Sequence, residues 1–436
     1  MTSSRFLGHQ ERLSGRLFLY VMTHTLPASP WFGGLQYLAD DVLFLIFEWC
    51  DVTTLGRLSQ VCRRFTRLLN NDNVWSKLTK CSLMTWHGSR LHSGRYYISA
   101  KERCMISENW LRGKRKEIRL VKYAFRQLPW LQATYDRLWY SSGSTIHCTE
   151  RRPDGCIVKR PLMVLQGHHD DVCRFIYADS YIISGGSDKS LCVWKSDSGR
   201  RILRVTNSHD SSVNCVGFSS DVIVSGSRDS TVKLWSLVSG RLQRTFTLED
   251  RVWSIAGNSK ARTFACGTAG INTAPLQVWD VESGSLLASL GVAPGYRRGA
   301  GVLDIVYDEP RTIVSCGYDS CVCVFDTRTN ACVLKLGDPH DSTVYCISTD
   351  HNYGIVSGTA RHALVRLWDQ RSGHSVQVHR QSSGSGSAQL FVRPPPRPMD
   401  GSRRPACNDV INRLSIVQTV NVTYKYNQYD DSMIQV

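Results

Sequence analysis

The sequence lacks several features that mark common classes of protein. Its 16 cysteines include no CxxC pair, and no group of His and Cys has the spacing of a zinc site. They also form no regular framework, which favours a reduced, intracellular protein over a disulfide-stabilised one. The apolar run Arg16–Met22 is too short to span a membrane and makes a poor signal peptide. We therefore expect no metal, no cofactor, no membrane association and a cytoplasmic location.

Acidic residues are scarce relative to basic ones, but the imbalance is local. The net charge is +16, yet residues 160–376 hold 22 Lys and Arg against 21 Asp and Glu. Residues 90–126 hold 11 basic and 3 acidic residues, which predicts a basic helical linker with a solvated face. A nuclear-import signal is the alternative reading of this run. Because no recognition fold accompanies it, nucleic-acid binding is not expected.

Internal repetition is the strongest positive signal. Five stretches end on an aromatic residue at intervals of 41, 44, 46 and 43 residues: Trp194, Trp235, Trp279, Phe325 and Trp368. An apolar run that starts with valine precedes each of them, at Val172, Val213, Val252, Val302 and Val344. Alternating apolar and polar residues favour strands, and the period is that of propeller blades of four strands. With a sixth copy at Leu138–Cys148, a mainly β propeller of about six recognisable blades is predicted.

Polar residues recur at fixed places within the repeats. Two sets share one order: His168, Ser184, Asp188 and Trp194, and His209, Ser225, Asp229 and Trp235. Ser225, Asp229 and His209 fit a nucleophilic triad, but a triad is needed once and the Ser-x-x-x-Asp spacing occurs again at Ser184 and Asp188. The order resembles the WD-repeat family. That resemblance implies a buried hydrogen-bond network which fixes each turn, so no catalytic residue is expected.

A helical pattern occupies the N-terminal third. In residues 54–69 the apolar side chains recur at three- and four-residue steps, which predicts one helix capped by Thr53 and ended by Asn70. Such a short segment cannot bury all its apolar surface, so the excess should face a partner; a self-contained helical bundle is the alternative. Residues 38–75 resemble the F-box family, except that Ala39 stands where proline is usual. The resemblance implies that a surface holds the small Skp adaptor, itself linked to a cullin scaffold, through Leu38, Val42, Leu43, Ile46, Phe47, Leu58 and Val61.

The predicted organisation has five parts. They are an extension (1–33), a small α-helical F-box domain (34–80), the basic helical linker (81–127), the WD-repeat β-propeller (128–376) and an atypical, flexible tail (377–436). The Ser/Gly- and Pro-rich residues 382–398 offer no final blade, although residues 414–429 have β propensity. Since such rings commonly have seven blades, six blades and this tail allow an incomplete ring.

F-box and WD repeats in one chain resemble the substrate-receptor subunits of cullin-based ubiquitin ligases, which are not themselves enzymes. The alternative is a protein-interaction scaffold outside any ligase. The resemblance implies that the protein substrate docks where the inner strands begin. The repeat alignment puts Arg228, Trp253, Tyr318 and Tyr345 there, and Arg251 and Arg361 lie nearby. Of the arginines that phosphopeptide-reading relatives carry there, only Arg228 matches, so an aromatic contact patch is expected rather than a phosphate reader. The alternative is that Trp253 and Tyr345 only fill the mouth of the central channel.

Overall fold

The computed structural model describes most of the propeller and the helical region. The described residues are 35–81, 90–91, 94–95, 99–112, 116–119, 129–133, 137–150, 157–158, 160–178, 180–291, 299–308, 312–337, 343–349, 353–359, 364–380, 389–392 and 416–419. The chain divides into two compact units, Met1–Val74 and Trp75–Val436. Among the described residues, no helix has the length and apolarity needed to cross a membrane.

The first unit is helical. Its elements are η1 (Leu35–Tyr37), α2 (Asp40–Phe47), α3 (Val52–Leu58) and α4 (Arg63–Leu69). The single helix predicted for residues 54–69 is wrong, because α3 ends at Leu58 and α4 begins after an extended Cys62. Asp51, rather than Thr53, caps α3, since its carboxylate accepts the Thr54 N–H at 3.0 Å. Because the chain turns between them, α3 and α4 pack against each other.

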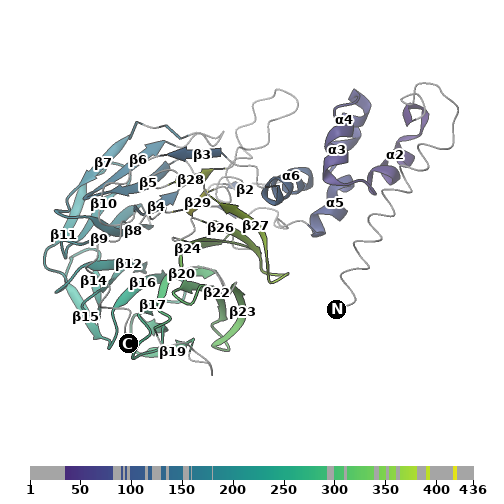
Figure 1. The fold of residues 1–436 in the computed structure, drawn as a ribbon. Helices are drawn as coiled ribbons and strands as arrows, with labels where there is room; N and C mark the ends of the chain where they lie inside the picture. The colour runs from purple at the N-terminus through teal and green to yellow at the C-terminus, as the bar shows by residue number, and fades with distance from the viewer. Residues whose placement is uncertain are drawn as a thin grey trace. The chain divides into compact units, whose positions relative to one another are not determined.

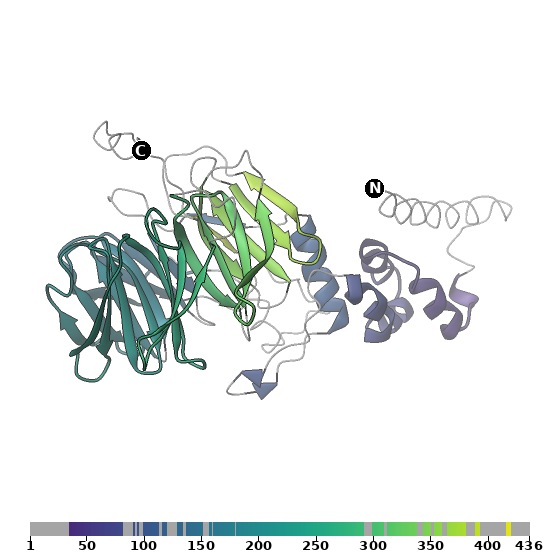
Figure 2. The same cartoon turned by 90° about the horizontal axis from the view of Figure 1, so that it is seen from below.

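The segment predicted as a helical linker contains both helices and strands. Its elements are the end of α5 (Asp72–Cys81), β1 (Arg90–Leu91), β2 (Gly94–Arg95), α6 (Ala100–Leu111) and β3 (Lys116–Arg119). Helix α6 lies against β27, the outer strand of the last four-stranded sheet (Figure 2). The basic run is thus extended at β3 rather than helical throughout.

Six four-stranded antiparallel sheets form the blades, which we number one to six (Figure 1). Blade one is β4 (Leu131–Ala133), β5 (Arg137–Ser142), β6 (Thr145–Glu150) and β7 (Met163–Gln166); blade two is β8 (Val172–Ala178), β9 (Tyr181–Gly186), β10 (Leu191–Lys195) and β11 (Arg201–Val205); blade three is β12 (Val213–Ser219), β13 (Val222–Ser227), β14 (Thr231–Ser236) and β15 (Leu242–Thr247).

The other three blades repeat this order. Blade four is β16 (Val252–Asn258), β17 (Thr263–Thr268), β18 (Leu276–Asp280) and β19 (Leu286–Leu290); blade five is β20 (Val302–Asp308), β21 (Thr312–Gly317), β22 (Cys321–Asp326) and β23 (Ala331–Gly337); blade six is β24 (Val344–Thr349), β25 (Gly354–Thr359), β26 (Leu364–Asp369) and β27 (His374–Arg380). The mainly β propeller that the repeats predict is confirmed.

A three-stranded sheet, which we call the closing sheet, lies between blades six and one. It contains β3, β28 (Gln389–Val392) and β29 (Ile416–Thr419), in the order β29-β28-β3. Strand β29 contacts β24 and β25 on one side and β4 on the other, and the inner strands of blades two to six each contact the preceding blade. The tail thus contributes two strands, contrary to the expectation that it offers no final blade, and the closing sheet occupies the place that an incomplete ring would leave empty. Strands from the linker and the tail fill the gap together.

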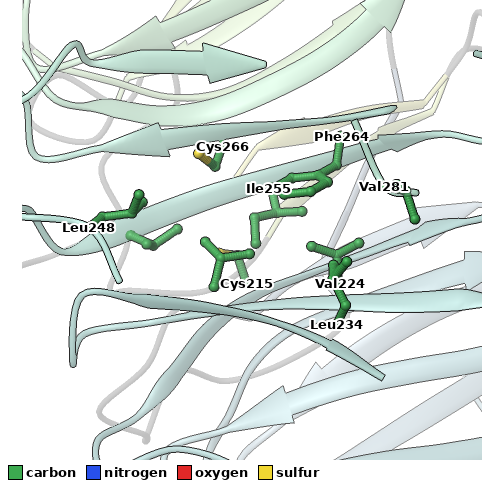
Figure 3. Close-up of a cluster of buried hydrophobic side chains, with 10 residues drawn as sticks. Cys215, Val224, Leu234, Leu248, Ile255, Phe264, Cys266 and Val281 are labelled. Carbon is green, nitrogen blue, oxygen red and sulfur yellow. The ribbon is translucent and has the colours of Figure 1, made fainter. Parts of the chain in front are cut away.

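Apolar side chains between neighbouring blades form the core. Between blades three and four, Cys215, Val224, Leu234, Ile255 and Phe264 pack together, and all are nearly or fully buried (Figure 3). Cysteine here serves as a small apolar residue, and burial raises the pKa of the Cys215 thiol. The blades therefore hold their loops on a rigid frame.

Candidate functional site

The turn of blade three joins four polar side chains. His209 contacts Ser225 Oγ through Nε2 at 2.7 Å and Asp229 Oδ2 through Nδ1 at 3.1 Å. Trp235 donates its Nε1 hydrogen to Ser225 Oγ at 2.9 Å. These distances would suit a nucleophilic triad, but Ser225 is 0% exposed, so a substrate atom has no path to its hydroxyl. The network instead satisfies buried polar groups and fixes the turn.

The corresponding network in blade two has a different electrostatic balance. His168 contacts Asp188 at 2.9 Å and Ser184 at 2.7 Å, as its counterpart does in blade three. Burial is the largest influence on both imidazoles. It lowers the pKa of His209 to about 4 with the help of the Lys233 ammonium. In blade two the interactions of His168 with Asp188 and with Cys192 together outweigh burial and raise the pKa of His168 to about 9.

Blade four holds its turn by another route. Asp250, which lies in the loop before β16, accepts the backbone N–H groups of Ile271, Asn272 and Thr273 at 2.8–2.9 Å through Oδ2. The carboxylate thus comes from the loop before the inner strand, the region that supplies histidine in blades two and three. Sequence reasoning missed this role of Asp250, because blade four has neither a histidine before its inner strand nor an aspartate in its turn.

One backbone hydrogen bond recurs in four blades, on the face where the inner strands begin. It joins the turn after the second strand of a blade to the loop before the inner strand of the same blade. It runs from Ser187 N to Asp171 O, Arg228 N to Ser212 O, Ala269 N to Arg251 O and Tyr318 N to Gly301 O, at 2.9–3.1 Å. The repetition aligns four blades on one face, which we call the loop face. The predicted contact residues Arg228 and Tyr318 therefore hold equivalent places on it.

The inner strands carry a second recurrent feature at the same face. Each of β8, β12, β16, β20 and β24 has a β-bulge right after its leading valine. The unpaired residues of these bulges are Cys173, Asn214, Trp253, Leu303 and Tyr345. A bulge re-aims a side chain and interrupts pairing, which is common beside functional sites. The predicted contact residues Trp253 and Tyr345 are thus two members of a ring of bulged, half-buried residues.

A buried ion pair crosses the ring. Arg174, next to the bulge in blade two, donates from Nη2 to Asp304 Oδ1 of blade five at 3.0 Å, and its guanidinium lies 3.8 Å from the Trp130 ring centroid. Asp304 also accepts the N–H groups of Ile305 and Ile347 at 3.1 and 3.0 Å. Both charged side chains are more than nine-tenths buried, so the Arg174 guanidinium is not available to bind phosphate at the loop face.

The predicted contact residues differ in exposure. Arg228 and Tyr318 are exposed, the latter by 41%, whereas Arg251, Trp253 and Tyr345 are half-buried. Arg361, which the sequence also places near this face, lies outside the described residues. Among the residues that the structure describes, the predicted contact residues at the loop face thus comprise one exposed arginine, one half-buried arginine and three aromatic side chains. That combination suits protein contacts better than recognition of a phosphate cluster.

The helical unit separates the predicted adaptor residues into three kinds. Leu43 and Phe47 are buried, Leu38, Ile46 and Leu58 are half-buried, and Val42 and Val61 are exposed. Phe47 packs edge-to-face on Phe65 at 5.4 Å. In this unit Leu43 and Phe47 therefore hold the helices together and present no surface of their own.

The helical unit also has three large exposed apolar side chains that sequence reasoning missed. Tyr37 is 83% exposed, Leu45 62% and Trp49 79%. Arg64 fixes the start of α2, because its Nε donates to Asp40 Oδ1 at 2.8 Å and its Nη2 to Leu38 O at 2.6 Å. The apolar run of α2 was the available signal, but a helix that is apolar all round does not reveal which face is covered.

Matches to family models agree with this division of the chain. Residues 40–81 match the F-box-like family, and residues 159–195 and 200–236 match the WD domain, G-beta repeat. The helical unit and the propeller thus define a protein of the F-box/WD-repeat class.

Similarity to whole proteins is more specific. Mouse F-box/WD repeat-containing protein 4 (dactylin) is 41% identical over 367 residues, which cover 82% of this chain and 88% of the relative. The human protein of that name is 41% identical over 347 residues, or 77% and 82% of the two chains. The Arabidopsis thaliana WD repeat-containing protein RUP1 matches 80 residues at 36% identity, 17% of this chain and 21% of the relative. This chain therefore belongs to the family of F-box/WD repeat-containing protein 4.

Proposed function

We propose that this chain is the substrate-receptor subunit of a cullin-based ubiquitin ligase. In this proposal the helical unit binds the Skp adaptor and the propeller holds the protein to be ubiquitinated. The chain supplies proximity rather than chemistry, since holding two reactants together raises their effective concentration. The burial of Ser225 within its network supports this non-catalytic role.

The exposed apolar side chains of the helical unit carry the proposal. Val42, Leu45, Trp49 and Val61 are all more than 40% exposed although the unit is small. Large apolar side chains exposed in this number on a small domain mark an interaction surface. An adaptor that covers these side chains would gain about 25 cal/mol for each Å² of apolar surface that it removes from water.

Copurification with the purified Skp adaptor tests this surface. The variant with both Leu45→Asp and Trp49→Asp should lose the adaptor while keeping its circular dichroism spectrum. Val238→Asp changes a 90% exposed residue of the propeller and serves as the matched control, which should retain the adaptor. Leu43→Asp is not diagnostic, because a charge at this buried site would unfold the unit. Equal recovery with the double variant and the control would refute the surface.

Cullin in the same purified complex distinguishes a ligase from other assemblies. We expect cullin wherever the adaptor is recovered. Adaptor without cullin would instead favour the chain as an interaction scaffold that acts outside a ligase.

The loop face is our proposed substrate site. Trp253, Tyr318 and Tyr345 with Arg228 provide aromatic rings and one exposed guanidinium, the side chains that most often anchor interfaces. Trp253→Ala with Arg228→Ala should change the set of proteins captured under proteasome inhibition but leave adaptor recovery intact. An unchanged set would show that substrate binds elsewhere.

A further inference from the structure

The two outer strands of blade five carry two cysteines that lie close together. The propeller fold does not require cysteine at either position. Cys323 lies in β22 and pairs across the sheet with Lys335, while Cys332 lies in β23 and pairs with Phe325. A β-bulge between Val324 and Phe325 shifts the register between these two pairs. Without the bulge, alternation from Lys335 would put Cys332 on the opposite face from Cys323; the extra residue brings both to one face.

The same bulge in other blades shows that cysteine is not a packing requirement here. The residues at the positions of Cys323 and Cys332 are Cys192 and Arg201 in blade two, Lys233 and Leu242 in blade three, Gln277 and Leu286 in blade four, and Arg366 and Ser375 in blade six. Among these five blades, blade five alone has sulfur at both positions. The pair therefore calls for an explanation other than the architecture of the repeat.

The surroundings make the two sulfurs unequal. Cys332 is exposed and Cys323 is half-buried, and the Cys323 thiol points toward Asp319 Oδ2 at 3.9 Å. The Cys332 thiol lies 3.5 Å from Leu334 O. The neighbouring Cys323 sulfur lowers the pKa of Cys332 to about 6, whereas the neighbouring Cys332 sulfur and burial raise the pKa of Cys323. The exposed sulfur is thus the nucleophile and its partner keeps the proton.

We propose that Cys323 and Cys332 form a peroxide-sensitive dithiol that closes into a disulfide between β22 and β23. The Cys332 thiolate attacks one oxygen of hydrogen peroxide, the O–O bond breaks, and the departing hydroxide takes a proton and leaves as water. The Cys323 sulfur then attacks the sulfenic acid on Cys332 and displaces its hydroxyl, which leaves as a second water with the Cys323 proton. The two thiols lose two electrons in total, and the peroxide gains them.

Peptide mapping of the full chain tests the bond. The reduced protein is treated with one equivalent of hydrogen peroxide at pH 7, blocked with N-ethylmaleimide and digested with trypsin without reduction. Cleavage after Arg311, Arg328 and Lys335 separates the two cysteines. We expect peptides 312–328 and 329–335 to remain joined, two hydrogens lighter than their sum apart from any N-ethylmaleimide on Cys316 and Cys321.

Neighbouring cysteines provide the controls. Cys321→Ser, which changes a nearby half-buried thiol of β22, should keep the joined peptides, and Cys323→Ser should abolish them. Alkylation of Cys332 by iodoacetamide at pH 7 should slow about tenfold in Cys323→Val, because the valine cannot share a proton with the neighbouring sulfur. A bond from Cys321 instead, no joined peptide, or an unchanged alkylation rate would each overturn the proposal.

Discussion

At the scale of the residue, one position decides how two equivalent histidines behave. His168 and His209 share a serine and an aspartate partner, but the residue two before the blade tryptophan is Cys192 in blade two and Lys233 in blade three. The Lys233 ammonium donates to Ser208 O at 2.7 Å, which holds a positive charge near His209. A like charge and burial both oppose protonation of an imidazole.

Lys233→Met should therefore raise the pKa of His209 from about 4 toward its ordinary value. In the parent chain the unfolded state binds more protons than the folded one between pH 6.5 and 4, so the stability from this site is complete above pH 6.5 and falls as the pH drops through that window. The variant should lose less stability there. NMR titration of labelled imidazoles gives the pKa directly, with His168, raised to about 9, as internal reference. An unmoved His209 would contradict the role of Lys233.

Ser225 tests the difference between a catalytic and a structural network. Ser225→Ala removes the acceptor of the Trp235 indole and a partner of His209, which leaves two buried polar groups unsatisfied. We expect a loss of about 1–3 kcal/mol in the free energy of unfolding for the groups left unpaired, measured by urea denaturation. Ser239→Ala, at an exposed position, should cost little. A cost as small as that of Ser239→Ala would mean that the network does not hold the turn.

At the scale of the element, repeated loops were easier to predict than pairings of distant segments. The alignment of the leading valines located Trp253 and Tyr345 correctly at equivalent places, because local alternation defines a strand. The pairing of β3 with β28 joins residues 116–119 to 389–392, and the sequence KEIR has neither alternation nor β-branched enrichment to announce it. Likewise, α2 is apolar at six consecutive positions, 42–47, so periodicity could not separate buried Leu43 from exposed Leu45.

The turn of blade four offers a test of how a carboxylate organises an element. Asp250 accepts three backbone N–H groups and the Thr273 hydroxyl, whereas the turn carboxylate of blade five, Asp319, accepts the Cys321 N–H at 3.2 Å. Asp250→Asn should therefore lower stability more than Asp319→Asn, by about 1–2 kcal/mol, since hydrogen bonds to a charged acceptor are the stronger ones.

Amide hydrogen exchange locates the effect. In Asp250→Asn the amides of Ile271, Asn272 and Thr273 should exchange faster, while those of blade five keep their protection. Equal protection of the turn in both variants would show that its conformation does not depend on the carboxylate.

At the scale of the whole molecule, two devices close the ring. The closing sheet connects blades six and one through strands from opposite ends of the propeller sequence, and the Arg174–Asp304 pair joins blades two and five across it. Neither is visible in a single repeat, because each depends on residues more than a hundred positions apart. Sequence repetition predicts the blades, whereas closure is a property of the assembled ring.

The ion pair can be tested by a double-mutant cycle. Arg174→Met leaves Asp304 buried without its countercharge and should cost about 3–5 kcal/mol in the free energy of unfolding. Asp304→Asn should also destabilise, because it leaves a buried guanidinium on the Trp130 ring. If the two charges act as a pair, the double variant should be less destabilised than the sum of the single ones, since no charge remains buried alone. Strictly additive losses in urea unfolding would mean that the residues stabilise their own blades and do not tie the ring together.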